Sequence, residues 1–483
     1  MLFNSLDFAI FFPLVFCLYW LFSKKLILRN ALILIASYIF YGWWDPRFLI
    51  LIVISSFIDF YLGKALYKTE NQKKRKLLLY ASLLVNLGFL IYFKYANFFI
   101  ETFIDSFTFF GNPIQVSSLN IILPVGISFY TFQTLSYTID IYRKQLKPTK
   151  DWLSFFAFVS FFPQLVAGPI ERASHLLPQF YETHKFRYSQ VKSGLLLMAF
   201  GLFKKMVIAD RVAIYVNQVY NNPADYHGFE IILGTVLFAF QIYCDFSGYS
   251  DIAIGAARTM GFDLMKNFDS PYFSKSITEF WRRWHISLST WFRDYVFIPL
   301  GGSRNGKYKT YANLFIVFVV SGLWHGAAMT FVIWGFIHGV IIVLEKASSS
   351  FRKKVYDRLG LSKNTFSNRF FFSSITFIIV CFAWLFFRAN SLSDAMLLIS
   401  NMFNFSEKTS SVYDIGWVAL DFDIALISIL ALLIFEYLRT KFNLYKAFNN
   451  QNVIFRWTSY GVIVSIIFVF RSIVVGDFIY FQF

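Results

Sequence analysis

The segment SGLWHGAA occupies residues 321–328, in the middle of an apolar run that extends over residues 311–344. One membrane crossing needs about 20 apolar residues, so the run is too long for a single span. A serine and two glycines interrupt it where a helix is expected to loosen. The interruption also holds His325, whose side chain titrates near neutral pH. Ionisable groups inside membrane segments are costly and are candidates for functional sites. We therefore predict a functional site at His325.

The composition is that of a membrane protein. Of 483 residues, 57% are hydrophobic, 22% are aromatic and only 15% are charged, whereas a soluble domain carries about 25% charged residues. The net charge of +17 does not indicate a nucleic-acid partner, because Lys and Arg fall mainly in loops, where they act as cytoplasmic anchors. The segment 6–22 has no basic residues before it and no cleavage signal after it, so we expect an uncleaved first span.

The pattern of apolar segments predicts an all-α, polytopic membrane protein with roughly eleven crossings. It also predicts re-entrant and interfacial helices. No repeat or soluble region interrupts the chain, so residues 1–483 are expected to form one membrane domain. The expected spans are 6–22, 28–44, 48–66, 77–95, 229–246, 311–323, 328–346, 371–388, 421–438 and 457–476, with further crossings among the stretches described next.

The apolar stretches 97–110, 119–142 and 151–170 are less regular, and together they carry Pro124, Gly126, Asp140, Pro163, Gly168 and Pro169. Non-helical backbone at membrane depth is tolerated only inside protein or beside a watery cavity, which favours broken helices lining a cavity. Ordinary Pro-kinked spans are the alternative, because Pro and Gly are common in membrane helices. Residues 190–220 mix leucines with Lys, Asp and Arg, so a helix lying on the membrane surface is expected there.

The distribution of basic residues predicts the orientation. Basic clusters at 24–29 and 73–76 place both loops in the cytoplasm, so the turn at 43–47 is expected outside.

Residues 276–300 predict a single amphipathic helix at the membrane surface. Ser276 and Glu279 have the spacing of a capping box, so the helix is expected to start there. Aromatic residues recur at three- and four-residue steps along one face, and Arg residues fall largely elsewhere. His285 lies close to the apolar face, either as part of a site or as an incidental residue of an interfacial helix.

The remaining histidines are weaker candidates. His175, His184 and His227 lie in polar connections and are expected to be solvated. On a continuous helix His338 would lie about 20 Å beyond His325, so the two share a site only if the helix breaks. No metal site is expected, because no H-E-x-x-H motif and no clustered cysteines are present among Cys17, Cys244 and Cys381. A histidine that only hydrogen-bonds a neighbouring helix is the alternative for His325.

Several long motifs resemble the membrane-bound O-acyltransferases (MBOAT), and within them the bacterial alginate O-acetyltransferase type. The resemblance covers nearly the whole chain. The motifs are PVGISF (124–129), PQLVAGPI (163–170), DFSGYSD (245–251), WRRWHISL (281–288), WFRDY (291–295), PLGG (299–302), GLWHG (322–326) and FIYFQF (478–483).

The resemblance implies a fold of helices around a central funnel and an O-acetyltransferase activity. It implies that His325 is the catalytic histidine and that His285 occupies the second signature position, where eukaryotic relatives usually carry Asn or Asp. The role of His285 stays open among positioning substrate, orienting His325 and holding structure. Contacts to substrate are expected from a further set of residues: Gln241, Asp245, Arg282, Trp284, Arg293 and Trp324.

The resemblance also implies partners and location. The expected donor is acetyl-CoA, with no permanently bound cofactor, and the expected acceptor is an exported polysaccharide such as alginate. Transfer is either direct or through a secreted SGNH-type acetyltransferase, from a multi-pass protein of the bacterial inner membrane, in contact with lipid and not with nucleic acid. The alternatives are O-acylation of a lipid or protein, D-alanyl transfer to teichoic acid, and a transporter or scaffold without enzymatic activity.

Overall fold

The computed structural model describes residues 1–109, 119, 121–166, 168–360, 365–405, 419–473, 476 and 478–481. Ala167, Gln482 and Phe483, which belong to two of the quoted motifs, and residue 110, the end of one apolar stretch, lie outside these ranges. Throughout the described residues the regular structure is helical, and the expectation of an all-α chain is confirmed there. The chain forms two compact units, residues 1–198 with 252–266, and residues 199–251 with 267–483.

Within the described residues, six helical segments are long and apolar enough to cross a membrane: Pro46–Lys68, Gln72–Thr108, Gly228–Thr259, Met329–Ala347, Phe366–Arg388 and Val453–Phe470. The helices Leu6–Phe22 and Leu26–Gly42 are apolar but shorter. These segments make the chain an integral membrane protein, as the composition predicts. The full set of roughly eleven crossings stays a prediction.

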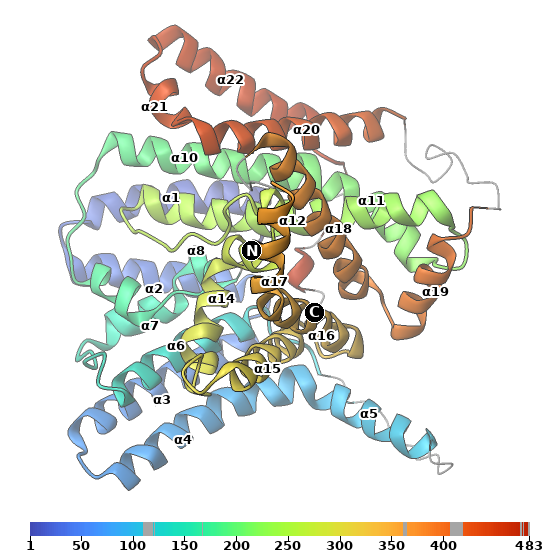
Figure 1. Ribbon diagram of the computed structural model, residues 1–483. Helices are drawn as coiled ribbons and strands as arrows, with labels where there is room; N and C mark the ends of the chain where they lie inside the picture. The colour runs from blue at the N-terminus through green and yellow to red at the C-terminus, as the bar shows by residue number, and fades with distance from the viewer. Residues whose placement is uncertain are drawn as a thin grey trace. The chain divides into compact units, whose positions relative to one another are not determined.

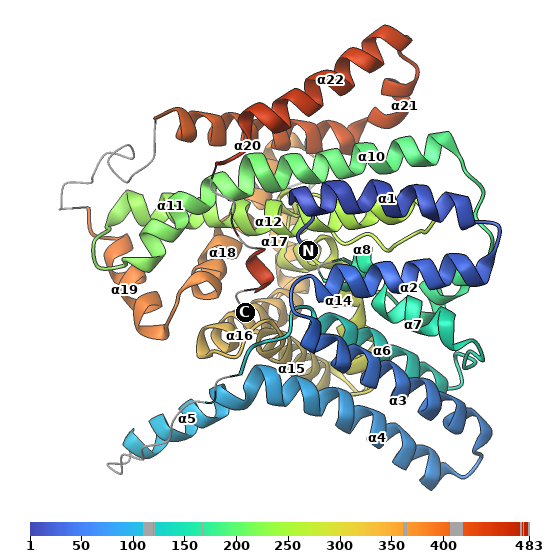
Figure 2. The same ribbon diagram turned by 180° about the vertical axis from the view of Figure 1, so that it is seen from behind.

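The first unit begins with long helices that pack side by side (Figures 1 and 2). They are α1 (Leu6–Phe22), α2 (Leu26–Gly42), α3 (Leu49–Lys68), α4 (Gln72–Leu90) and α6 (Ile127–Tyr142), while α5 (Ala96–Phe109) continues from α4 after a π-helical turn at Ile91–Tyr95. Asp59 of α3 is fully buried and accepts hydrogen bonds from Asn86 of α4 (2.9 Å) and Thr138 of α6 (3.1 Å). Buried polar groups need such partners, so these bonds specify how the three helices pack.

The Pro- and Gly-rich stretches do break the helices of this unit. Gly126 adopts a left-handed conformation (φ 74°) immediately before α6, and Phe161 separates α7 (Trp152–Ser160) from α8 (Phe162–Leu165). A Cβ atom at position 126 would lie 2.8 Å from the carbonyl oxygen of Leu165, so this turn requires glycine. The predicted interruptions are confirmed, and the cavity that they were expected to line stays a prediction.

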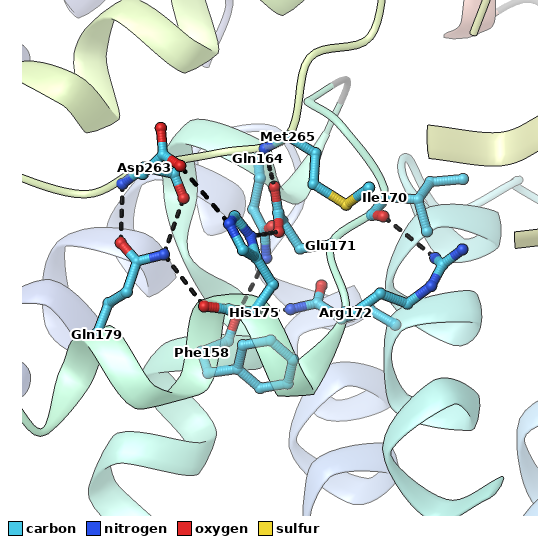
Figure 3. A network of polar contacts seen from close by, with 10 residues as sticks. Phe158, Gln164, Ile170, Glu171, Arg172, His175, Gln179, Asp263 and Met265 are labelled. Atoms are coloured by element: carbon cyan, nitrogen blue, oxygen red, sulfur yellow. Dashed lines mark hydrogen bonds and ion pairs between the residues drawn. The ribbon is translucent and has the colours of Figure 1, made fainter. Parts of the chain in front are cut away.

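A network of hydrogen bonds joins the connection after α8 to residues 263–265 (Figure 3). The buried carboxylate of Glu171 accepts hydrogen bonds from Nδ1 of His175 (2.8 Å) and from the amide of Met265 (2.5 Å). His175 lies on α9 (Ala173–Leu176), and its Nε2 is 3.6 Å from the carboxylate of Asp263. Gln179 accepts from the Asp263 amide at 2.8 Å. We call Glu171, His175, Gln179, Asp263 and Met265 the Glu171 network.

The expectation that three histidines are solvated is confirmed only in part, because all three are half-buried and two of them have polar partners in the protein. His175 belongs to the Glu171 network. The Nδ1 atom of His184 lies 2.7 Å from the hydroxyl of Tyr19 and 3.0 Å from the carbonyl oxygen of Met260. His227 is half-buried. The polar residues around His184 remain largely exposed, while the histidine itself contacts the protein.

The second unit contains the GLWHG and WRRWHISL motifs. Its helices include α11 (Asp210–Asn221), most of α12 (Gly228–Thr259), α13 (Ile277–Arg283), α14 (Ile286–Phe292), α15 (Lys307–His325), α16 (Met329–Ala347) and α17 (Ser349–Arg358). It continues with α18 (Phe366–Arg388), α19 (Leu392–Met402), α20 (Ala419–Lys441), α21 (Leu444–Asn449) and α22 (Val453–Phe470). Helix α16 packs against α13, α15 and α18, so it lies at the centre of this group.

Residues 190–220 differ from the surface helix expected for them. They form α10 (Tyr188–Leu202), a π-helical turn at Phe203–Ala209 and α11. The charged residues of the turn and of the start of α11 are buried: Lys204, Lys205, Asp210 and Arg211. They are buried because each finds an opposite charge, with Lys205 within 2.8 Å of both Asp210 and Asp245.

Candidate active site

His325 ends helix α15, at the turn of a helical hairpin. Gly326 is extended and α16 begins at Met329, so the predicted interruption is confirmed at 326–328, whereas Ser321 and Gly322 remain helical. The two helices approach closely at glycines: a Cβ atom at Gly322 would lie 2.3 Å from the carbonyl oxygen of Phe331, and one at Gly335 would lie 2.4 Å from that of Phe318. The small residues therefore allow the hairpin to form, and its turn holds a buried His325.

His285 lies at a break that the aromatic periodicity did not predict. The helix starts at Ser276 as expected, because the Ser276 hydroxyl accepts a hydrogen bond from the Glu279 amide (3.1 Å). It ends at Arg283, and His285 adopts a left-handed conformation (φ 43°, ψ 55°) before α14 begins. The prediction of one continuous surface helix over 276–300 is therefore wrong. The break turns His285 into the protein, where its exposed fraction is 0%.

The two histidines lie close together. Their ring centroids are 6.5 Å apart. Trp324 lies beside both, with its ring centroid 4.9 Å from that of His325 and 6.0 Å from that of His285. Burial lowers the pKa of His285 to about 3, so its imidazole is neutral at physiological pH. This arrangement supplies two imidazoles in a water-poor, aromatic setting.

His338 is separated from this pair by a tryptophan. The ring centroid of Trp334 is 5.0 Å from that of His325 on one side and 5.0 Å from that of His338 on the other. The Nδ1 atom of His338 accepts a hydrogen bond from the indole of Trp281 (3.3 Å). The helix does break between His325 and His338, but the ring of Trp334 lies between the two histidines and keeps them apart.

The predicted substrate-binding residues lie in different surroundings. Trp324 lies at the histidine pair, whereas Trp284 is fully buried and stacks on Phe280, with centroids 5.5 Å apart. Arg282 and Arg293 are exposed, and Arg293 pairs with Asp294 at 2.7 Å. Gln241 is half-buried on α12. Nothing in this geometry tests substrate binding by these residues, which stays a prediction.

Asp245 belongs to a buried ion cluster that holds the end of the chain. Its carboxylate pairs with Lys205 (2.8 Å) and accepts a hydrogen bond from the amide of Ile479 (2.7 Å), while Lys205 donates to the carbonyl oxygen of Gly476 (3.1 Å). These contacts place Tyr480 with its ring centroid 5.7 Å from that of His325. The motifs DFSGYSD (245–251) and FIYFQF (478–483) were both noted in the sequence. The sequence did not predict that they contact each other and place Tyr480 beside His325.

Asn267 is the neighbour of His285 that sequence reasoning missed. Its side-chain oxygen lies 3.0 Å from Nδ1 of His285 and accepts a hydrogen bond from the hydroxyl of Ser287 (2.9 Å). It precedes the WRRWHISL motif, in a connection without periodicity, so no sequence pattern marked it. Among the described residues no group of three or more His, Cys, Asp or Glu side chains is placed to hold a metal ion.

Comparison with known proteins agrees with these motifs. Residues 143–387 match the membrane-bound O-acyltransferase family. The protein named "Probable alginate O-acetylase AlgI" from Pseudomonas syringae pv. tomato is 41% identical over 84% of this chain and 76% of its own length. The protein of the same name from Azotobacter vinelandii is 40% identical over 85% of this chain and 80% of its own. The "Peptidoglycan O-acetyltransferase" of Helicobacter pylori is 33% identical over 83% and 80%. The chain therefore belongs to the membrane-bound O-acyltransferase family and is an acyltransferase enzyme.

Proposed function

We propose that the protein transfers acetyl groups from a cytoplasmic thioester, acetyl-CoA, to hydroxyls of an exported polysaccharide, directly or through a secreted SGNH-type acetyltransferase. The observation that carries this proposal is the buried pair of His325 and His285, with ring centroids 6.5 Å apart, in a chain whose relatives are named for O-acetylation of alginate and peptidoglycan. O-acylation of a lipid or protein and D-alanyl transfer to teichoic acid are the competing functions.

The chemistry starts from a weak nucleophile. A sugar hydroxyl needs a base within hydrogen-bond reach at neutral pH, and we assign that role to neutral His325. The hydroxyl oxygen forms a bond to the thioester carbonyl carbon, the C–S bond breaks, and the hydroxyl proton passes through His325 to the leaving thiolate. The surrounding aromatic rings of Trp324, Trp334 and Phe387 limit access of water, which would otherwise hydrolyse the thioester.

A basic surface supports an anionic donor. The exposed residues are Arg282 on α13, Arg293 directly after α14, Arg304 in the next connection and Lys307 at the start of α15. We assign them to the phosphates of coenzyme A, since Arg and Lys are the usual phosphate partners. A positive-inside anchor would use the same residues, so the assignment requires that their replacement raise KM for the donor.

The membrane arrangement in this proposal follows from the donor's charge. Moving several phosphates through a bilayer is prohibitively costly, so the donor and the acceptor reach His325 from opposite sides through a thin barrier. The bacterial inner membrane, cytoplasmic clusters at 24–29 and 73–76, and a central funnel belong to this proposal. A cysteine at position 74 labelled only from outside would contradict it.

The decisive experiment uses the purified protein in liposomes with its secreted partner and polysaccharide oligomers. Radiolabelled acetyl-CoA is expected to label the oligomers with the wild-type protein and not with His325→Ala. Transfer of a D-alanyl group from its carrier, or labelling of lipid alone, would replace this proposal with one of the competing functions.

A further inference from the structure

Asn267 connects the two sides of the strained turn that carries His285. Its backbone carbonyl oxygen accepts a hydrogen bond from the amide of Ile286 (2.9 Å), the residue after His285. Two residues further along, the amide of Asp269 donates to the carbonyl oxygen of Arg283 (2.9 Å). The segment 267–269 thus pairs with 283–286 and holds His285 in its left-handed conformation, which is unfavourable for a residue other than glycine.

The side chain of Asn267 is fully buried and is used at both of its ends. Its amide nitrogen donates to the hydroxyl of Ser250 on α12 (3.0 Å). Its oxygen therefore faces the opposite direction, toward the Ser287 hydroxyl at 2.9 Å and the Nδ1 atom of His285 at 3.0 Å. In the structure the amide nitrogen thus faces Ser250 and the amide oxygen faces the imidazole.

An amide oxygen can only accept a hydrogen bond, so it decides the tautomer of the ring beside it. Facing that oxygen, neutral His285 carries its proton on Nδ1 and its lone pair on Nε2. A residue that held the ring by packing alone would leave the two tautomers to compete. The hydrogen-bond partner of Nδ1 thus determines whether Nε2 is a donor or an acceptor.

We propose that Asn267 is a positioning residue, which fixes the Nδ1–H tautomer and the ring direction of His285 so that Nε2 acts as an acceptor in the acyl-transfer site. The inference rests on the proposed function for its catalytic consequence, but the tautomer is a property of the protein without substrate. Asn267 acts through His285 and is assigned no contact with donor or acceptor.

The tautomer is measured directly by 15N NMR of the full-length protein, labelled at histidine and reconstituted in lipid. His285→Gln identifies the His285 signals among those of the six histidines. We expect the wild-type signals to show a protonated Nδ1 and an unprotonated Nε2. Asn267→Leu, which keeps the shape and removes the acceptor, is expected to give mixed tautomers. A wild-type ring protonated on Nε2 would overturn the inference.

The kinetics of acyl transfer provide a second test of the role of Asn267. Replacement of residues that orient a functional histidine typically costs about 10- to 100-fold, so Asn267→Leu is expected to lower kcat by that factor with little change in KM for the donor. Asn267→Asp puts a carboxylate beside Nδ1, which favours the charged ring without a lone pair on Nε2, so its kcat is expected to fall as well. Ser287→Ala removes the other hydrogen bond to the same oxygen and is the matched control, with kcat close to wild type.

These outcomes separate the inference from the proposed function. If the wild-type protein transfers no acetyl group from any thioester, the proposed function fails, and the 15N spectra still decide the role of Asn267. If Asn267→Leu does not fold, the wild-type spectrum still decides the tautomer and Asn267→Asp is compared with it: a ring that keeps its Nδ1–H and gains a second proton supports the inference, and a ring protonated on Nε2 alone overturns it. Unchanged tautomer and kcat in a folded Asn267→Leu would also overturn it.

Discussion

The structure holds two histidines by contrasting means, His175 in the first unit and His285 in the second. At His175 the partner of Nδ1 is a carboxylate, Glu171 at 2.8 Å, and a second carboxylate lies 3.6 Å from Nε2 (Figure 3). At His285 the partner of Nδ1 is an amide oxygen, Asn267 at 3.0 Å. The hydrogen bond to Glu171 raises the pKa of His175, while burial lowers that of His285.

The difference shows how partner chemistry assigns a role to one side-chain type. A carboxylate favours the charged imidazole and makes His175 one half of an ion pair that joins two connections. A neutral acceptor in an aromatic core favours the uncharged ring, which retains a lone pair for proton transfer. Only the second environment suits a histidine that works beside a general base.

Replacement of His325 should give the largest effect. His325→Ala is expected to lower acyl transfer by about 10²- to 10⁴-fold, the usual contribution of a general base, at normal abundance in the membrane. Replacement of His285 by Ala is also expected to be severe. Acetyl transfer per mole of folded protein is the measurement.

His338→Ala is the control for that series. His338 lies behind Trp334, so its loss should reduce stability through a cavity while transfer per folded molecule stays near wild type. An inactive His338→Ala together with an active His325→Ala would mean that the site is assigned to the wrong histidine.

The second unit also contains a buried lysine, Lys205, whose positive charge balances two buried carboxylates. Lys205→Met removes the cation between Asp210 and Asp245, each 2.8 Å from its ammonium group, and leaves two buried carboxylates. Breaking a buried ion pair costs about 3–5 kcal/mol, so the melting temperature of the purified protein should fall strongly. Activity should fall further, because the same lysine anchors Gly476 near Tyr480.

The adjacent Lys204 offers a matched comparison. It is equally buried and pairs with Asp251 at 2.7 Å, but the carboxylate of Asp251 is partly exposed (21%) and can be solvated when the lysine is lost. Lys204→Met should therefore lower the melting temperature less. Equal losses for the two variants would argue against the buried triad as the source of the effect.

Glu171→Gln sharpens the comparison by making the environment of His175 resemble that of His285. Without the carboxylate the pKa of His175 should fall, because the hydrogen bond to Glu171 is the main cause of its elevation. NMR titration of labelled histidine measures the change. Asp263→Asn is the control, with a smaller decrease expected because Asp263 is 77% exposed and lies farther from the ring. A fall as large in Asp263→Asn would show that Glu171 is not the principal partner.

Much of the helical pattern could be predicted from the sequence, because it rests on local signals. Apolar length located α1, α2, α3, α15, α16 and α18 to within a few residues, and the Ser276 cap and the break at 326–328 follow from residue type. The proximity of His325 and His285 was expected only through the family resemblance.

The remainder depends on contacts between segments far apart in the chain. Periodicity did not predict the break at His285, because the left-handed turn is held by Asn267, which lies outside the periodic segment. The charges at 204–211 appeared suited to a surface because their partners, Asp245 and the end of the chain, are remote in sequence. A local sequence pattern does not show which polar groups pair with partners far away in the chain.

The smallest expected effect concerns the pH dependence of the Glu171 network. The pKa of His175 is raised above its unfolded value of about 6.5, so its contribution to stability is fully present below pH 6.5 and is lost as pH rises through the raised pKa.

Hydrogen exchange at the amide of Met265 measures this change, because that amide donates to Glu171 at 2.5 Å. After correction for the intrinsic pH dependence of exchange, its protection should decrease by no more than about 5-fold, since His175 is 38% exposed and solvent screens the pair. His175→Gln should abolish the pH-dependent step and leave protection near His285 unchanged. Protection that increases with pH in the wild-type protein would contradict the ion pair and remove the contrast between the two histidines.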